Sequence, residues 1–203
     1  MILLHGYGAP ADDLVPLGAT VSRATGCLAV MPAGPEPAAG GRQWWSLDDW
    51  RRRRAAGEDL SDQVPAGLEE ASRRVQGVVR TLGARGIPPD RVVLAGFSQG
   101  AILALDAGLS AERPLGGIGV LSGTLIARSR WVAAIERGAP PPVLMTHGRD
   151  DSLLTFNRAD ALRQLLAEHQ VTTTLVPFAG GHTIPAVARE RLIGFVRARV
   201  GQR

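Results

Sequence analysis

Short runs of apolar residues alternate along the chain with segments whose apolar residues repeat at helical spacing. The apolar runs predict about six buried strands, because continuous runs are typical of strands that are covered on both faces. These runs are Met1–Leu4, Cys27–Met31, Val92–Ala95, Leu115–Leu121, Pro142–Thr146 and Val171–Val176. The threonines of the last run favour a half-exposed position at the edge of the sheet.

The segments between these runs predict helices. Their apolar residues fall three and four positions apart, with polar residues opposite, as on the buried face of an amphipathic helix. The helical segments are Ala11–Thr25, Ala66–Arg85, the run after Gly100, Phe156–His169 and Thr183–Val200. This alternation of strands and helices predicts an α/β fold, with a mostly parallel sheet and helices on both of its faces.

Residues 32–64 interrupt the alternation. The segment is rich in proline and glycine, and it holds Trp44, Trp45 and Trp50. A loop of this length inside a compact domain is usually functional, so we expect a lid-like or pocket-forming loop. The segment is too short to bury a core of its own, and the chain length suits a single domain over residues 1–203.

The composition argues against several classes of protein. The chain is 45% hydrophobic and 21% charged, which is typical of a globular protein, and its net charge is +4 with only arginine as the basic residue. Its one basic cluster, Arg51–Arg54, is bracketed by the acidic pairs Asp48–Asp49 and Glu58–Asp59. We therefore interpret the cluster as a solvated surface segment and not as a nucleic-acid site.

The cysteine content and the start of the chain bear on the compartment. The single cysteine, Cys27, allows no disulfide within the chain, and its apolar surroundings favour a buried position. No apolar stretch is long enough to cross a bilayer, and Met1–Leu4 lacks the features of a secretory signal, so we expect a cytoplasmic protein. A strand at the first residue indicates either a fold trimmed at this end or a true start elsewhere.

The strongest chemical signal is Gly96-Phe97-Ser98-Gln99-Gly100, which follows an apolar run and precedes a helix-forming one. This pattern is typical of a sharp strand-to-helix turn that presents a serine nucleophile. Glycine is expected at positions 96 and 100, because side chains there would collide with the closely packed strand and helix. We expect Ser98 itself to have a strained backbone conformation.

An acid and a base follow later strands. Ligands of an open parallel sheet bind beyond the carboxyl ends of its strands, which is where the chain places Ser98, the pair Asp150–Asp151 and His182. The order Ser, Asp, His is the one expected on an α/β-hydrolase scaffold, with His182 as the base. Spacing alone does not separate Asp150 from Asp151. The other histidines, for which we expect local structural or solvated positions, are His5, His147 and His169.

Further residues near this edge of the sheet complete the predicted site. The backbone N–H groups of Tyr7 and Gln99 are the expected donors to the oxyanion of a tetrahedral intermediate. Trp44 and Trp45 either form an apolar wall of the substrate pocket or pack their loop onto the body of the protein. Neither metal-ligand spacing nor a glycine-rich nucleotide motif is present, so we expect no metal and no cofactor.

These motifs resemble the phospholipase/carboxylesterase family of α/β-hydrolases, which includes acyl-protein thioesterases and small bacterial carboxylesterases. The matching segments are Leu4–Gly8, Gly41–Ser46, Gly96–Gly100, His147–Asp151 and Gly181–His182. The family's acid is the third residue after His-Gly, which implies Asp151, and its oxyanion donors fall on Tyr7 and Gln99. Family members usually carry earlier strands that this chain lacks, and Ser152 and Leu154 replace a usual proline and valine.

The resemblance and the motifs together predict a serine hydrolase. It would cleave carboxylic esters or thioesters through a Ser98–Asp151–His182 triad and an acyl-enzyme. The alternatives are a lysophospholipase, lactonase or peptidase with the same triad, or a non-catalytic binding protein on the same scaffold. We expect a small-molecule ester or thioester as partner, no nucleic acid and no stable membrane insertion. An exposed edge of the sheet could pair in a homodimer.

Overall fold

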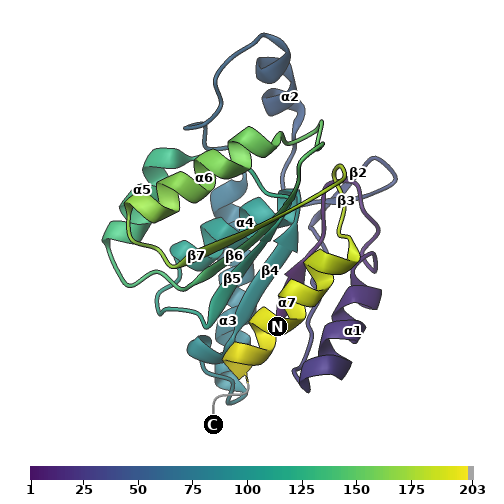
Figure 1. Cartoon of the computed structure of the whole chain (residues 1–203), viewed down its shortest axis with the longest axis vertical. Coiled ribbons are helices and arrows are strands. Elements are labelled where there is room, and N and C mark those ends of the chain that lie inside the picture. Colours follow the sequence, from purple (N-terminus) through teal and green to yellow (C-terminus); the bar gives the residue numbers. More distant parts are fainter. Residues whose placement is uncertain (201–203) are drawn as a thin grey trace.

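The computed structural model of the protein describes residues 1–200, and in this range it has a central sheet of five parallel strands. The strands are β1 (Ile2–Leu4), β4 (Val93–Phe97), β5 (Gly117–Leu121), β6 (Val143–Gly148) and β7 (Thr173–Phe178). Their order is β1-β4-β5-β6-β7, so β1 and β7 are the edges of the sheet (Figure 1). The predicted α/β architecture and the edge position of the last strand are confirmed.

The sheet of the described residues has five strands and not about six, because Cys27–Met31 does not form a strand. In this segment Val30 makes a single parallel bridge to Ile2, and its carbonyl accepts a 2.9 Å hydrogen bond from the N–H of Leu3. The neighbouring strand β1 is only three residues long. Pro32 follows closely and has no N–H to donate, so the pairing does not extend.

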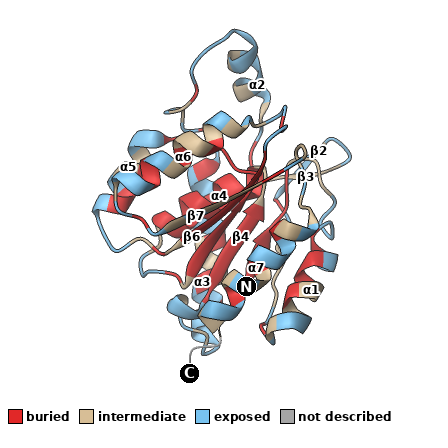
Figure 2. Ribbon diagram, viewed as in Figure 1, coloured by how far each residue is buried: buried red, intermediate tan, exposed pale blue. Residues whose placement is uncertain are grey.

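Helices cover both faces of the sheet. The helices of one face are α1 (Val15–Thr25) and α7 (Ala186–Val200), and those of the other face are α3 (Leu68–Ala84), α4 (Gln99–Leu109), α5 (Arg128–Glu136) and α6 (Phe156–Glu168). A 3-10 helix, η1 (Pro89–Arg91), precedes β4. Figure 2 shows that the inner strands of the sheet are buried, whereas exposed residues lie on the outer sides of the helices. The edge strand β7 is mostly half-buried. No helix within residues 1–200 is long and apolar enough to span a membrane.

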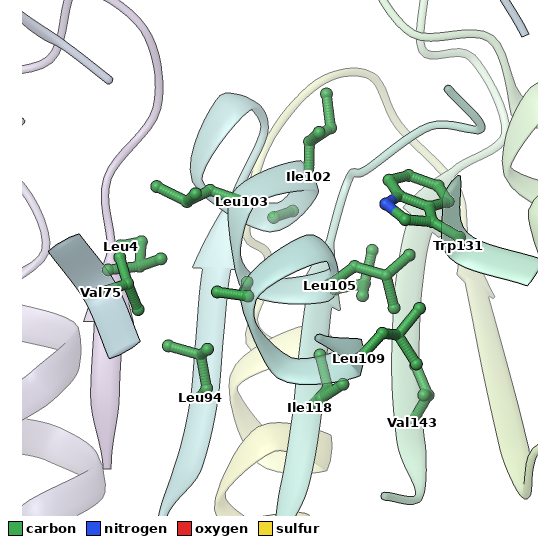
Figure 3. Close-up of a cluster of buried hydrophobic side chains, with 14 of the residues drawn as sticks. Leu4, Val75, Leu94, Ile102, Leu103, Leu105, Leu109, Ile118, Trp131 and Val143 are labelled. Atoms are coloured by element: carbon green, nitrogen blue, oxygen red, sulfur yellow. The ribbon is translucent and has the colours of Figure 1, made fainter. Parts of the chain in front are cut away.

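Two apolar cores hold these layers together. Neighbouring residues of a strand face opposite sides, so Leu94 joins the core beneath α3–α6 while Val93 and Ala95 join the core beneath α1 and α7. Figure 3 shows the larger core, with Leu105 of α4 among the side chains between the helices and the sheet. Every residue of α4 is buried, so the position of its first turn is fixed by packing along its whole length.

The segment at residues 32–64 is more regular than its composition suggests. It contains an antiparallel hairpin, β2 (Glu36–Ala38) and β3 (Gly41–Gln43), and the helix α2 (Asp48–Ala55). Helix α2 has acidic residues in its first turn and arginines in its last turn, an arrangement that favours a helix through its dipole. None of its residues is buried, and it projects from the end of the molecule in Figure 1. This absence of an apolar face explains why the hydrophobic pattern did not predict α2.

A buried carboxylate lies on α4, away from the motifs of the sequence analysis. The side chain of Asp106 is 1% exposed, and it accepts hydrogen bonds from Arg130 Nε (2.8 Å), Trp131 Nε1 (3.0 Å) and the hydroxyl of Ser72. Its hydrogen bonds to Arg130 raise the pKa of that guanidinium. The cluster joins α3, α4 and α5, so it fixes three helices of one layer relative to one another.

We expect Asp106→Asn to lower the free energy of unfolding by about 3 kcal/mol, because it leaves Arg130 without its buried counter-charge. Urea denaturation measures this change. The matched control is Arg52→Gln, which breaks an exposed ion pair with Asp49 and should change the stability by less than about 0.5 kcal/mol. Equal effects of the two substitutions would contradict a structural role for the cluster.

Candidate functional site

Ser98 lies at the apex of the turn between β4 and α4. Its φ of 55° and ψ of −118° put it in a conformation that residues with a side chain rarely adopt. A Cβ atom at Gly96 would collide with the carbonyl of Gly100, and one at Gly100 would collide with the carbonyls of Leu4 and His5. Both glycines are therefore required by close backbone contacts, and the serine is held at the carboxyl end of the sheet.

The structure brings together three of the predicted side chains. His182 Nε2 lies 2.8 Å from Ser98 Oγ, and His182 Nδ1 lies 2.7 Å from Asp151 Oδ2. Asp151 and His182 come from the loops after β6 and β7, and these loops touch where a Cβ atom at Gly148 would collide with the carbonyls of Gly180 and Gly181. The chain of hydrogen bonds thus spans three strand ends.

The two neighbouring aspartates have different surroundings. Asp151 is 4% exposed, and its Oδ1 accepts 2.9 Å hydrogen bonds from the backbone N–H groups of Leu153 and Leu154. Asp150 is exposed, and its Oδ2 accepts a 3.2 Å hydrogen bond from the N–H of Gly180. The geometry therefore separates the two: Asp151 faces His182, while Asp150 braces the loop that carries His182.

His147 lies behind the carboxylate of Asp151. Its Nε2 is 2.6 Å from the carbonyl of Leu154 and 3.3 Å from Asp151 Oδ2. A carbonyl only accepts hydrogen bonds, so the Nε2 of His147 carries a proton. Burial lowers the pKa of His147, because it disfavours the charged imidazolium. A neutral, buried histidine therefore holds the loop from which the carboxylate projects.

The other two histidines have local contacts. His5 is 2% exposed, its Nδ1 lies 2.7 Å from the carbonyl of Gly6, and its Nε2 accepts a 2.9 Å hydrogen bond from the N–H of Gly34. His169 ends α6, where its Nδ1 lies 3.8 Å from Glu136. Neither ring touches Ser98 in the described part of the chain.

The loop of Gly6 and Tyr7 lies directly beside the serine. A Cβ atom at Gly6 would lie 3.4 Å from the Cβ of Ser98, so the two residues are in van der Waals range of each other. The backbone N–H groups of Tyr7 and Gln99 have no acceptor among residues 1–200. Two unpaired backbone donors are therefore found next to the serine, one in the loop after β1 and one in the residue that follows Ser98.

The segment with Trp44 and Trp45 holds this loop in position. The side-chain amide of Gln99 bonds the N–H of Trp44 (3.0 Å) and the carbonyl of Trp45 (2.9 Å), as a neighbouring strand would. The indole of Trp44 donates to the carbonyl of His5 (2.9 Å) and its ring lies 5.0 Å from the imidazole. Both tryptophans are buried, at 4% and 1% exposure.

A cavity of about 740 Å³ opens beside Ser98 and His182. Its walls are the loop of residues 6–9, one side of α2, Phe97 and the loop of Leu153 and Leu154. A smaller apolar cavity of about 60 Å³ adjoins Ser98 on the side of Trp45. Trp44 lines neither cavity. No group of three or more His, Cys, Asp or Glu side chains is arranged to hold a metal ion in the described range.

Several cavity residues were missed by the sequence analysis. Trp50 lines both cavities, and Arg51 and Arg54 line the larger one. The signal was present, since residues 47, 50, 51, 54 and 55 repeat at helical spacing and share one side of α2. The sequence analysis did not use this spacing, because it interpreted the whole arginine run, flanked by acidic residues, as a solvated surface segment.

Comparisons with known proteins agree over nearly the whole chain. Residues 1–199 match the family model described as phospholipase/carboxylesterase. Carboxylesterase SOBER1 from Arabidopsis thaliana is 26% identical over 210 aligned positions, which cover 98% of this chain and 90% of that protein. Acyl-protein thioesterase 1 from Gibberella zeae is 26% identical over 165 positions, 77% of this chain and 70% of that protein.

The solved structures agree with this result. The crystal structure of esterase PE8 is similar with a TM-score of 0.84 at 29% identity, over 98% of this chain and 91% of the other. The matched region holds the serine turn and both later loops. With sequence and fold in agreement over this length, the chain belongs to the phospholipase/carboxylesterase family of α/β-hydrolases.

Proposed function

We propose that the protein cleaves carboxylic esters or thioesters, with Ser98 as nucleophile, His182 as general base and Asp151 as the acid that orients His182. Membership of the family supports the broad class of ester or thioester hydrolases. The observation that carries the assignment of residues is the hydrogen-bonded chain from Ser98 through His182 to Asp151, which starts at a strained turn beside a cavity.

The order of proton transfers follows from the contacts. The carboxylate of Asp151 only accepts hydrogen bonds, so it holds the proton of His182 on Nδ1. The free Nε2 then takes the proton of Ser98 as Oγ attacks the acyl carbon. The imidazolium gives this proton to the leaving oxygen or sulfur, and the acyl group stays on Ser98. A water molecule activated by His182 then hydrolyses the acyl-enzyme and restores the serine.

The unpaired backbone donors of Tyr7 and Gln99 stabilise the tetrahedral intermediate in this proposal. The developing oxyanion would accept both N–H groups, which need no reorganisation because packing and hydrogen bonds already hold them. The side chain of Gln99 has a separate part, since it ties the Trp44–Trp45 segment to the first turn of α4. Gln99 thus supplies one backbone donor, and its side chain holds the segment whose Trp44 indole bonds His5, next to the loop of the other donor.

We expect Ser98→Ala to lower kcat for a short-chain p-nitrophenyl ester by at least about 10⁴-fold, because no other nucleophile lies at the turn. His182→Gln should cause a loss of similar size. The double variant should be no worse than either single variant, because the two residues act as a unit. Initial rates with purified variants, and labelling of Ser98 by a fluorophosphonate, measure these effects.

The control for these variants is Asp150→Asn, which alters the neighbouring carboxylate but leaves the hydrogen bond between Asp151 and His182 intact. It should keep kcat within about tenfold of the wild type, whereas Asp151→Asn should lose far more. Full activity of Ser98→Ala, or a larger loss at Asp150 than at Asp151, would refute the assigned roles.

The lowered pKa of His147 predicts a pH-dependent stability. The unfolded chain takes up a proton on this ring below pH about 6.5, while the folded protein resists it, so the unfolded state binds more protons there. The contribution of His147 to stability is therefore present above pH about 6.5 and is lost as the pH falls toward the lower, folded-state pKa.

We expect the difference in unfolding free energy between wild type and His147→Gln to shrink as the pH falls from 7.5 to 5. Denaturant titrations at several pH values measure this difference. A constant difference for His147→Gln would show that burial of this ring does not control its charge.

A further inference from the structure

The four consecutive arginines of α2 divide into two pairs with different surroundings. Arg52 bonds Asp49 (2.7 Å) and Arg53 bonds Glu58 (2.7 Å), so each has a carboxylate partner. Arg51 and Arg54, which are three residues apart on the other side of the helix, line the cavity beside Ser98. The acidic residues that bracket the run therefore neutralise only the pair that faces away from the cavity.

The cavity-facing pair keeps most of its hydrogen-bonding capacity. Within residues 1–200, neither Arg51 nor Arg54 has a carboxylate oxygen within 4.0 Å. Arg51 Nη1 donates to the hydroxyl of Tyr7 (3.1 Å), and Arg54 Nη1 donates to the carbonyl of Leu153 (2.7 Å). Each guanidinium has five N–H donors, so both can bind further oxygen atoms.

The existing contacts orient both guanidinium groups. The guanidinium carbon of Arg51 lies 4.3 Å from the ring centre of Tyr7, and that of Arg54 lies 5.1 Å from the ring centre of Trp50. Both aromatic residues line the same cavity, and stacking on a ring leaves the edge of a guanidinium free to bind a planar anion. The pair is thus held at the cavity by two polar contacts and two aromatic rings.

We propose that Arg51 and Arg54 form a recognition site for an anionic oxygen group, such as a carboxylate or a phosphate, on the ester or thioester substrate. The inference rests on the proposed function of Ser98, since it concerns which substrates reach that residue. Asp13 is the one carboxylate that lines the cavity in the described part of the chain, so the formal charge of its side chains, with His182 neutral, is +1. Arginine binds carboxylates and phosphates through paired N–H donors, whereas a purely apolar acyl chain would use neither charge.

The test compares charged and neutral substrates of similar shape. Four esters form two pairs. Anionic p-nitrophenyl hemiglutarate, with its charge on the acyl group, is paired with neutral p-nitrophenyl butyrate. Anionic 4-(butanoyloxy)benzoate, with its charge on the leaving group, is paired with its neutral methyl ester. The measured quantity is the ratio of kcat/KM for the anionic ester to kcat/KM for the neutral ester of the same pair, and variants are compared by this ratio. At low ionic strength the wild type should favour at least one anionic ester, and the ester that is favoured identifies which end of the substrate meets α2.

The double variant Arg51→Gln/Arg54→Gln should lower this ratio about tenfold, as expected for the loss of hydrogen bonds to a charged group. Its activity on the neutral ester reports any disturbance of the nearby Leu153–Leu154 loop. Such a disturbance affects both esters of a pair and therefore does not change their ratio. Arg51→Lys/Arg54→Lys should restore part of the ratio, because charge is kept but the paired donors are lost. Arg52→Gln is the matched control on the opposite side of α2 and should leave the ratio unchanged.

The outcomes separate this proposal from the proposed function. A wild type that cleaves the neutral ester through Ser98 but prefers neither anionic ester would overturn the anion site and leave the hydrolase assignment standing. An unchanged ratio in the double variant, or an equal fall in Arg52→Gln, would do the same. Loss of the anionic preference in 0.5 M NaCl supports direct charge recognition, since exposed charges are screened at high salt. Undiminished activity of Ser98→Ala would instead refute the function itself.

Discussion

The contact between the first turn of α4 and the end of β1 controls the geometry of the candidate site. Gly100 packs so tightly on the carbonyls of Leu4 and His5 that no side chain fits between them. This approach sets the height of Ser98 above the sheet, and it also draws the Gly6–Tyr7 loop to the side of the serine. Because α4 is buried along its whole length, the turn cannot relax by shifting the helix. The unusual backbone angles of Ser98 are maintained by packing that extends far from the site.

Polar contacts complete what apolar packing begins. The carboxylate of Asp151 receives two backbone N–H groups and one histidine, and a second histidine lies behind it. On the other side, the amide of Gln99 pairs with the backbone of the tryptophan segment. Each of these buried groups has several partners, which a low-dielectric interior requires. The candidate site is therefore rigid on the side that holds the serine, the histidine and the aspartate.

The parts of the fold that depend on burial could be predicted from the sequence, and those that depend on polar contacts could not. The strand that presents Ser98 follows from its continuous apolar run, and the loops of Asp151 and His182 follow from their places after later strands. In contrast, α2 buries no residue and α5 buries only Trp131, Ala134 and Ile135, so the buried apolar pattern that reveals the other helices is weak in both. The prediction of a strand at Cys27–Met31 was wrong although the segment is apolar. An apolar run forms a strand only beside a partner strand long enough to pair with it, and β1 has three residues. The division of the four arginines into two pairs could not be predicted either, because it depends on α2, which the sequence analysis did not predict.

Helix α2 differs from every other wall of the cavity in the source of its stability. It buries no side chain, and its arginines contact a tyrosine hydroxyl, a backbone carbonyl, the carboxylate of Glu58 and the side chain of Gln63. Such contacts contribute little free energy, so this helix belongs to the least stable part of the chain, while α4 belongs to the most stable. Mutations in α2 therefore cost the fold almost nothing, whereas mutations near the serine turn are severely limited by packing. A protein built in this way can change its choice of substrate over evolutionary time without disturbing the residues proposed to carry out the reaction.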